Sequence, residues 1–200
     1  MMFREGILVV VSGPSGAGKG TVLNVFKEQE KNTRFSISAT TRKPRKGEVE
    51  GVNYFFKSNE EFERMVASNE LVEWVKYCDN CYGTPKKYID DTIKQGMNCL
   101  LEIEVEGALN IKKAYPDSVC IFLLPPSFEE LKKRIEGRGT ESPDIIAKRL
   151  EKAKREILFA DRYDYIIIND DIENAVSSLR SILVAEKLKY KRNRDILKMM

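Results

Sequence analysis

A glycine-rich segment near the N-terminus has the residue types and spacing needed to hold phosphate groups. Gly13-Pro14-Ser15-Gly16-Ala17-Gly18-Lys19 follows an apolar run and opens a helical stretch. In this G-x-x-x-x-G-K pattern the glycines let backbone N–H groups curl around phosphate oxygens, and the helix N-terminus adds its positive dipole. Lys19 can reach the β- and γ-phosphates of a nucleoside triphosphate. A flexible glycine-rich turn is the alternative, and the joint presence of strand, spacing, lysine and helix argues against it.

The residue after Lys19 departs from the usual form of this loop. Ser or Thr commonly follows the lysine and contacts Mg²⁺ through its hydroxyl, but this chain has Gly20, with Thr21 next. A glycine cannot bind a metal through a side chain. We therefore expect the cofactor Mg²⁺ to be held mainly by nucleotide phosphates and water, because this ion loses its water reluctantly. We expect no metal site made of protein side chains alone.

Two arginines further along the chain could bind a second phosphate. Arg42 and Arg45 flank Pro44, which holds the chain extended, so that two forked guanidinium groups can converge on one anion. The alternative is a solvated basic loop, which these residues alone slightly favour. The chain has no N-K-x-D tetrapeptide of the kind that GTPases use to bind guanine.

The chain contains no histidine, and this limits its chemistry. Ser-His and Cys-His nucleophiles and histidine general bases are excluded. Any reaction must therefore use Lys, Arg, carboxylates, hydroxyls and the backbone.

The four cysteines favour packing over chemistry. Cys78 and Cys81 form a C-x-x-C pair, which could be half of a zinc site or a redox pair. A structural zinc ion needs four ligands, and the chain offers no histidine and no second C-x-x-C. Cys99 and Cys120 lie in apolar runs and are typical of buried packing residues. We therefore favour the packing interpretation.

The elements that must position these residues alternate between apolar strands and amphipathic helices. Capping boxes at Ser58 and Ser127 indicate helix starts, and Pro85 and Pro143 suit first helical positions. Together with the phosphate-binding loop, this alternation predicts an α/β fold, a P-loop NTPase-type parallel sheet with helices on both faces. The predicted buried strands are residues 7–11, 99–103, 119–124 and 165–168.

Three regions depart from this alternation. Residues from about 35 to 82 are Thr-rich, basic and aromatic, and they predict a small strand-rich insert with short strands at 54–56 and 71–75. The polar, glycine-containing segment 136–142 lies between two helices and fits a mobile loop. A final helix is predicted from about Asp171 to Arg194.

Composition sets the class of protein. Two hundred residues suit one domain, and 34 Lys and Arg against 31 Asp and Glu leave a formal charge of +3. That excess does not imply nucleic acid or membrane binding, and no obligate protein partner is inferred. No apolar run approaches the roughly 18 residues of a membrane span, and the N-terminus does not read as a signal peptide. We expect a cytoplasmic protein.

An ordered set of motifs resembles guanylate kinase over nearly the whole chain, from Gly6 to about Glu186. No single short motif is specific, and the resemblance depends on their order. The motifs are Gly13 to Lys19, Ser38-x-x-x-Arg42-x-x-Arg45-x-Gly47-Glu48, Gly51-x-x-Tyr54, Glu73-Trp74, Tyr82-Gly83-Thr84, Pro125-Pro126-Ser127, Glu136-Gly137-Arg138-Gly139-Thr140 and Ile168-Asn169-Asp170-Asp171.

The resemblance implies ATP as donor, GMP as acceptor and Mg²⁺ as cofactor, in purine nucleotide metabolism and GMP recycling. A carboxylate at Glu73 can accept hydrogen bonds from guanine N1–H and the 2-amino group together, a donor pair that adenine lacks. A solvent-facing strand residue is the alternative for Glu73. The resemblance assigns the acceptor phosphate to Arg42, Arg45, Tyr54 and Tyr82, guanine to Ser38, Glu73 and Thr84, and a place beside the acceptor to Glu104.

The resemblance also implies a lid that carries arginines to the phosphates. Arg138 and Arg149 would bring positive charge to the equatorial oxygens in a dry site, and with Lys19 and Arg42 they are the expected catalytic residues. The chain would divide into a core (1–34, 97–133 and 157–200), a GMP-binding insert (about 35–96) and a lid (about 134–156). The expected ATP-binding residues are Gly13, Pro14, Ser15, Gly16, Ala17, Gly18, Lys19, Gly20, Thr21, Arg134, Arg138 and Asn169.

Two rivals and two departures accompany this interpretation. A kinase of the same fold could act on another phosphorylated metabolite, such as a ribosyl bisphosphate, but Glu73 and Ser38 argue against it. A guanylate-kinase-like binding module for phosphopeptides would have a degraded phosphate loop, whereas Lys19 is intact. Glu104 replaces the Asp more common in the family, and Glu106 stands where many relatives have Gln.

Overall fold

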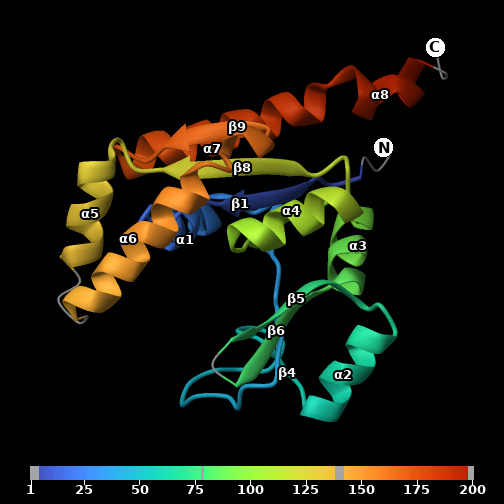
Figure 1. Cartoon of the computed structure of the whole chain (residues 1–200). Coiled ribbons are helices and arrows are strands. Elements are labelled where there is room, and N and C mark those ends of the chain that lie inside the picture. The colour runs from blue at the N-terminus through green and yellow to red at the C-terminus, as the bar shows by residue number, and fades with distance from the viewer. Residues whose placement is uncertain (1–4, 78, 138–141, 198–200) are drawn as a thin grey trace.

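Five parallel strands form the sheet at the centre of the molecule (Figure 1). The computed structural model describes residues 5–77, 79–137 and 142–197. The strand order is β2-β7-β1-β8-β9, and every neighbouring pair is parallel. The predicted α/β class is confirmed. In that order the strands span Thr33–Phe35, Asn98–Glu102, Leu8–Ser12, Val119–Leu124 and Tyr165–Ile168.

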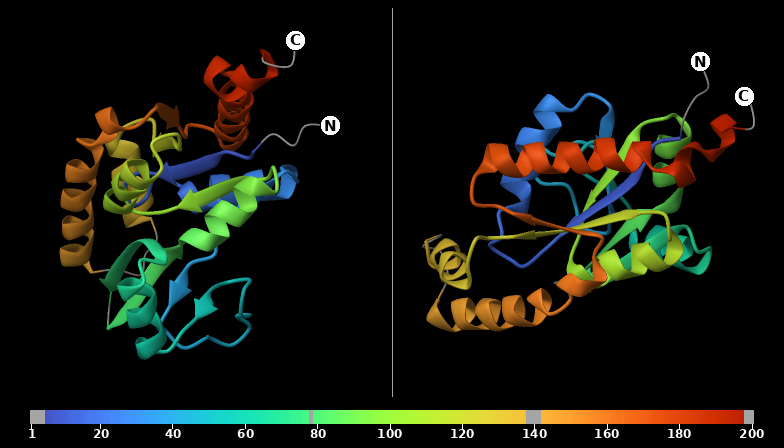
Figure 2. Two further views of the ribbon diagram at one scale, coloured as in Figure 1. Left: turned by 90° about the vertical axis from the view of Figure 1, so that its right-hand side faces the viewer. Right: turned by 90° about the horizontal axis from the view of Figure 1, so that it is seen from above.

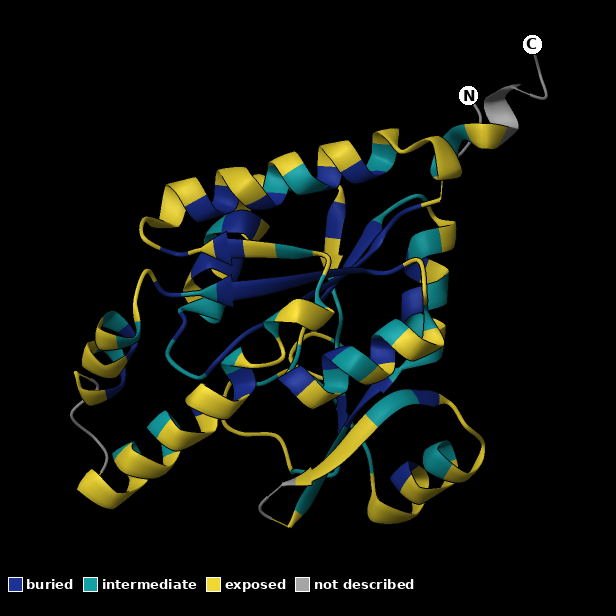
Figure 3. Cartoon of the chain, turned by 45° about the horizontal axis from the view of Figure 1, so that its top comes forward, coloured by how far each residue is buried: buried dark blue, intermediate teal, exposed yellow. Residues whose placement is uncertain are grey.

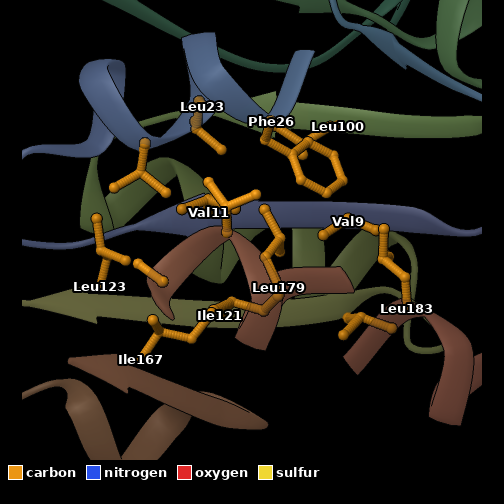
Figure 4. Close-up of a cluster of buried hydrophobic side chains, with 14 of the residues drawn as sticks. Val9, Val11, Leu23, Phe26, Leu100, Ile121, Leu123, Ile167, Leu179 and Leu183 are labelled. Carbon is orange, nitrogen blue, oxygen red and sulfur yellow. The ribbon is translucent and has the colours of Figure 1, made fainter. Parts of the chain in front are cut away.

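The central strand β1 is buried on both faces, which explains its unbroken apolar sequence. Successive side chains of a strand point to opposite faces. Val9 and Val11 therefore pack with helices α1 (Lys19–Gln29) and α7 (Ile172–Leu188), as Figure 4 shows, whereas Leu8 and Val10 pack on the side of α3 and α4. Each fully buried aliphatic side chain of this kind contributes about 1.5–3 kcal/mol. Helices α3 and α4 span Lys86–Lys94 and Val105–Ala114.

A second, four-stranded sheet forms the insert that lies below the central sheet in Figure 1. Its order is β4-β3-β6-β5, and it has a small core of its own around Phe62 of helix α2 (Asn59–Ala67). Ser58 starts α2 with the predicted capping box, since both reciprocal hydrogen bonds are present. In sheet order the strands span Phe55–Phe56, Ala39–Thr40, Asn80–Pro85 and Leu71–Tyr77.

Helices α5 (Phe128–Glu136) and α6 (Pro143–Ile157) stand beside one end of the central sheet (Figure 2). Leu131 and Ile135 of α5 pack against Ala153 of α6 in a fourth apolar cluster. Pro143 is the first residue of α6, as predicted. A short 3₁₀ turn, Ala160–Arg162, then leads into β9.

Several predicted boundaries need correction. No strand was predicted at β2, β3 or β6, because these strands are short or polar. Pro85 caps α3 in an extended conformation and is not its first helical residue. Ser127 accepts from the backbone N–H of Glu130, but the Glu130 carboxylate accepts from Arg134 instead of completing the reciprocal box.

The final helix is also divided, contrary to prediction. It ends at Leu188, Lys189 leaves the helical conformation with ψ of 135°, and a separate helix α8 runs over Tyr190–Leu197. The break is stabilised by Asn193, whose amide donates to the carbonyl oxygens of Lys187 and Lys189 at 2.7 and 2.8 Å. Among the described helices, none has the length and apolar character to cross a membrane.

The distribution of buried residues follows the arrangement of sheets and helices (Figure 3). The central strands are largely buried, whereas much of the insert and the outer faces of α6 and α7 are exposed. Cys99 and Cys120 are buried free thiols in the central sheet, as expected of packing residues, and Cys81 is a half-buried free thiol. Cys78 lies outside the described residues.

Candidate active site

The glycine-rich loop connects β1 to α1 at the carboxyl end of the central strand. Gly18 caps α1 in the left-handed conformation, with φ of 90°. A Cβ atom at this position would also lie 2.4 Å from Nδ2 of Asn169. Only glycine satisfies both conditions, so the loop conformation depends on the glycine that precedes Lys19.

Lys19 turns back over this loop. Its ammonium group donates to the carbonyl oxygens of Gly13 at 2.7 Å and Pro14 at 3.3 Å. Burial lowers the pKa of Lys19, although the carboxylates of Glu104 and Glu102 oppose that shift. The amino group therefore sits in a partly desolvated place, where a phosphate would be a stronger partner than a neutral carbonyl.

Two residues outside the loop, one after β9 and one on α5, hold its backbone through hydrogen bonds. Asn169 follows β9, is 4% exposed, and donates through Nδ2 to the carbonyl oxygen of Ala17 at 2.8 Å. Arg134 of α5 donates to the carbonyl oxygens of Asn169 at 3.1 Å and Ala17 at 3.5 Å, and pairs with Glu130 at 2.9 Å. Asn169 and Arg134, which were both expected to bind ATP, thus contact the loop.

Helix α6 contacts the loop directly through Arg149. Its Nη2 donates to Oγ of Ser15 at 2.5 Å. This contact joins two expected site residues that lie far apart in the sequence. Arg138, the other arginine expected on this side, lies outside the described residues.

A charged cluster that the sequence analysis largely missed lies between β7 and α6. Glu104 accepts from Lys152 at 2.8 Å, and Lys152 also pairs with Glu156 at 3.4 Å. Burial raises the pKa of Glu102 and Glu156; for Glu104, burial acts in the same direction, but Lys152 and Lys19 outweigh it and lower the pKa. No motif indicated Lys152 or Glu156, and only their spacing on α6 could have suggested a shared face.

The same cluster bears on metal binding. In the described part of the chain, no three His, Cys, Asp or Glu side chains gather as a metal site. A Cβ atom on Gly20 would meet only Oε1 of Glu102, at 3.9 Å. The protein thus offers a carboxylate beside the loop and Lys19, but no hydroxyl at position 20. This donor set fits a hydrated Mg²⁺ that arrives with the nucleotide.

A second cluster lies in the insert and contains most of the expected acceptor residues. The guanidinium of Arg42 lies 5.3 Å from the ring centroid of Tyr54, whose ring is 6.0 Å from that of Tyr82. Arg42 also pairs with Glu48 through Nη1 and Nη2, at 2.9 and 2.7 Å. The side chain of Arg45, three residues on, is exposed. The structure therefore brings Arg42 and the two phenols together, and Arg45 is linked to Arg42 through Glu48, which accepts from its backbone N–H.

Glu73 of β5 and Thr84 of β6 form the second part of this cluster, two residues along β6 from Tyr82. The hydroxyl of Thr84 donates to Oε1 of Glu73 at 2.6 Å, and burial raises the pKa of Glu73, an effect that Thr84 partly opposes. Ser38 lies between β2 and β3, where its carbonyl oxygen accepts from the N–H of Phe55 at 2.9 Å. A Cβ on Gly107 would lie 3.3 Å from Oε2 of Glu73, so the glycine leaves room for this carboxylate against α4.

Gly107 connects the two clusters. It lies in the first turn of α4, which begins just after Glu102 and Glu104 at the end of β7. Those carboxylates act on Lys19, while Glu73 lies against Gly107. The Glu73 carboxylate of the insert cluster thus adjoins the edge of the sheet that carries the phosphate loop.

Comparison with known proteins gives a consistent result. The family model described as guanylate kinase matches residues 5–186. The guanylate kinase of Caldanaerobacter subterraneus subsp. tengcongensis is 50% identical over 96% of this chain and 94% of its own, and that of Bacillus subtilis is 50% identical with the same coverage. The crystal structure of guanylate kinase from Anaplasma phagocytophilum superposes with a TM-score of 0.76, at 36% identity, over 98% of this chain and 95% of that one.

Proposed function

Because the chain belongs to the guanylate kinase family and phosphorylates GMP to GDP at the expense of ATP, we propose that the two clusters are the two substrate sites of this reaction. The phosphate loop with Lys19 is the donor site, and the insert pocket around Arg42 and Glu73 is the acceptor site. The observation that carries the proposal is their junction at Gly107, where the acceptor carboxylate lies against the helix that follows Glu102 and Glu104.

At the donor site, the loop backbone and Lys19 would bind the β- and γ-phosphates. Asn169 and Arg134 hold the loop carbonyl of Ala17, which keeps the backbone N–H groups turned toward the phosphates. Arg149 contacts Ser15 and would place a guanidinium beside the transferred group. Arg138 keeps its expected role in ATP binding and catalysis as part of this proposal.

At the acceptor site, Arg42 and Arg45 with the phenols of Tyr54 and Tyr82 would bind the GMP phosphate. Glu73 would accept from guanine N1–H and the 2-amino group, and Thr84 holds that carboxylate at 2.6 Å. Ser38 lies beside these strands, and Glu104 lies between acceptor and donor. The longer side chain at position 104 is held by Lys152, which keeps its carboxylate near Lys19.

The transfer itself requires position and charge. The attacking oxygen of the GMP phosphate is already anionic, so no general base is needed, in agreement with a chain that has no histidine. Lys19, Arg42 and Arg149 would neutralise the charge that spreads over the transferred group. Bound Mg²⁺ supplies further neutralisation of the β- and γ-phosphates, and Glu102 and Glu104 would hold its water shell.

The proposal keeps a core, an insert and a lid, and it changes one boundary of the insert. Ile89 of α3 packs with the central strands, which supports ending the insert near Pro85 instead of near residue 96. ATP and GMP are the proposed partners, without nucleic acid, membrane or an obligate protein. We place the activity in the cytoplasm, in keeping with the free thiols of Cys81, Cys99 and Cys120.

A coupled assay of ADP release tests the assignment. Wild type should turn over with ATP and GMP and hardly with AMP or UMP. Glu73→Gln should weaken the use of GMP by about 2 kcal/mol in kcat/KM, because the new amide opposes donor to donor at guanine. The KM for ATP should stay unchanged. Equal losses for both substrates would show that Glu73 is structural and would refute its place in the acceptor site.

A further inference from the structure

Glu48, which no motif assigned a role, is the residue that the acceptor arginines share. Its Oε1 accepts from Arg42 Nη2, and its Oε2 accepts from Arg42 Nη1 and from the backbone N–H of Arg45 at 2.7 Å. The side chains of Arg42 and Glu48 are only 14% and 19% exposed. A two-bond pair in this setting fixes the orientation of the guanidinium as well as its place.

The donors of Arg42 can be accounted for one by one. A guanidinium has five N–H donors in one plane. Glu48 takes one from Nη1 and one from Nη2, and the carbonyl oxygen of Lys43 takes another from Nη1 at 2.9 Å. Neither of these acceptors uses the Nε–H or the second Nη2–H, which share one edge of the group, and the Tyr82 hydroxyl also interacts with the guanidinium. Such an edge binds a phosphate through two parallel hydrogen bonds.

Aromatic rings and one hydroxyl surround the same guanidinium. Tyr54 and Phe56 place their ring centroids 5.3 and 6.0 Å from its central carbon, and Tyr82 interacts with it through its hydroxyl. The rings allow the planar group to turn, because a ring face offers no directional hydrogen bond. The bidentate carboxylate of Glu48 opposes that rotation.

Glu48 also sets the position of Arg45. The N–H of Glu48 donates to the carbonyl oxygen of Arg45 at 3.0 Å while its side chain accepts from the N–H of Arg45. Gly47, with φ of 91°, supplies the left-handed residue that this turn requires. The turn therefore holds both arginines to one carboxylate.

We propose that Glu48 is a positioning residue for the acceptor: it occupies the end of the Arg42 guanidinium and thereby presents the Nε–Nη2 edge, with Arg45 beside it, to the phosphate of GMP. This inference rests on the proposed function, because it takes Arg42 and Arg45 as the phosphate-binding pair. Glu48 stays on Arg42 when GMP binds, since the phosphate takes a different edge. The Arg42 hydrogen bond, with that from Arg45, lowers the pKa of Glu48 to about 2, so the carboxylate remains charged at any working pH.

The test measures GMP and guanosine affinity by calorimetry without ATP, for wild type, Glu48→Gln, Arg42→Ala and the double variant. Glu48→Gln should weaken GMP about tenfold or more, the scale of a hydrogen bond to a charged group, and leave guanosine, which has no phosphate, unchanged. In the Arg42→Ala background the same substitution should have little further effect, because both act on one group. Glu50→Gln, a matched change on the same loop, should leave GMP affinity as in wild type.

The other outcomes are distinct. Tighter GMP binding by Glu48→Gln would show that Glu48 competes with the phosphate. An equal loss of affinity for GMP and guanosine, or an equal loss in the wild-type and Arg42→Ala backgrounds, would show a structural role. Each of these results overturns the inference, and so does an unchanged GMP affinity. Arg42→Ala reports on the proposed function separately. If that variant binds GMP like wild type, the acceptor site itself is misassigned.

Discussion

At the scale of single residues, Lys19 shows how the donor site is prepared for its ligand. Its ammonium group is held by two neutral carbonyl oxygens of the loop, and charged phosphate oxygens are better partners. We expect Lys19→Ala to lower kcat by roughly a hundredfold or more, the scale of one preorganised charged donor, while the thermal unfolding midpoint changes little. Lys27→Ala, on the same helix, is the control and should keep its turnover. A folded Lys19→Ala enzyme with normal turnover would contradict the donor assignment.

Glu73 makes a prediction about pH. Burial raises its pKa above the ordinary glutamate value, and only the ionised carboxylate can accept two hydrogen bonds from guanine. The affinity for guanine should therefore be at its maximum above this raised pKa. Below it, the affinity should fall, approaching a tenfold loss for each pH unit. Calorimetry with guanosine between about pH 8 and about pH 5 measures the effect without interference from a titrating phosphate. Glu73→Gln should bind guanosine weakly and without this pH dependence; a variant with the wild-type pH profile would assign the titration to another group.

At the scale of elements, helix α6 reaches the phosphate loop through Arg149, at 2.5 Å from Ser15. A guanidinium delivered by this helix should act mainly on the transition state, where negative charge spreads over the transferred group. We expect Arg149→Ala to lower kcat by about a hundredfold, with no change in GMP affinity measured without ATP. Arg155→Ala, on an exposed face of the same helix, should have neither effect. Loss of GMP affinity with turnover preserved would move Arg149 to the acceptor pocket.

Elements with strong local signals could be predicted from sequence, and those that depend on neighbours could not. The strands at 119–124 and 165–168 and the helix start at Pro143 agree with the structure, because apolar runs and proline act locally. The strands β3 and β6 contain polar residues that lie in a sheet only because the insert pairs them. The break at Lys189 depends on Asn193 and on ion pairs beyond the helix, for which the periodicity of α7 gives no signal.

The candidate site divides in the same way. Loop glycines, Lys19 and the paired arginines follow from motif spacing, because each motif is contiguous. Lys152 and Glu156 are brought to Glu104 only by the packing of α6, so no local pattern indicates them. Glu48 stood within a recognised motif, but its role requires the bond geometry around Arg42.

At the scale of the whole molecule, Glu186 ties three elements together. It lies near the end of α7, is 2% exposed, accepts from the hydroxyl of Tyr165 on β9 at 2.6 Å, and pairs with Lys189 and Arg192 at 2.5 and 3.6 Å. Burial alone would raise its pKa, but the hydrogen bonds from Lys189 and Tyr165 and the two positive charges lower it. Its contribution to stability is therefore present above the ordinary glutamate pKa, about 4.3, and is lost as the pH falls through the lowered value.

We expect Glu186→Ala to reduce the free energy of unfolding by about 1–2 kcal/mol near neutral pH, because it removes a buried carboxylate that accepts from Tyr165 and pairs with Lys189 and Arg192. Denaturant titration checks this, and the difference from wild type should shrink in acid. The ion pair of Lys191 with Asp117 is the control: both side chains are more than half exposed, so Lys191→Ala should cost no more than about 0.5 kcal/mol. A similar cost for the two variants would show that burial does not distinguish the pairs.

The pairing of β1 also fixes an order of events during synthesis. Leu8 is paired with Cys99 and Val9 with Val119, so the first strand to leave the ribosome finds its neighbours only after the whole insert has followed it. The pairs of the second sheet all fall between Ala39 and Pro85. Until Leu124 has emerged, this buried strand lacks at least one of its two neighbours and is open to wrong associations. In refolding with pulsed hydrogen exchange, we expect protection at Val9 and Val10 to arrive together with that of β8 and not before it.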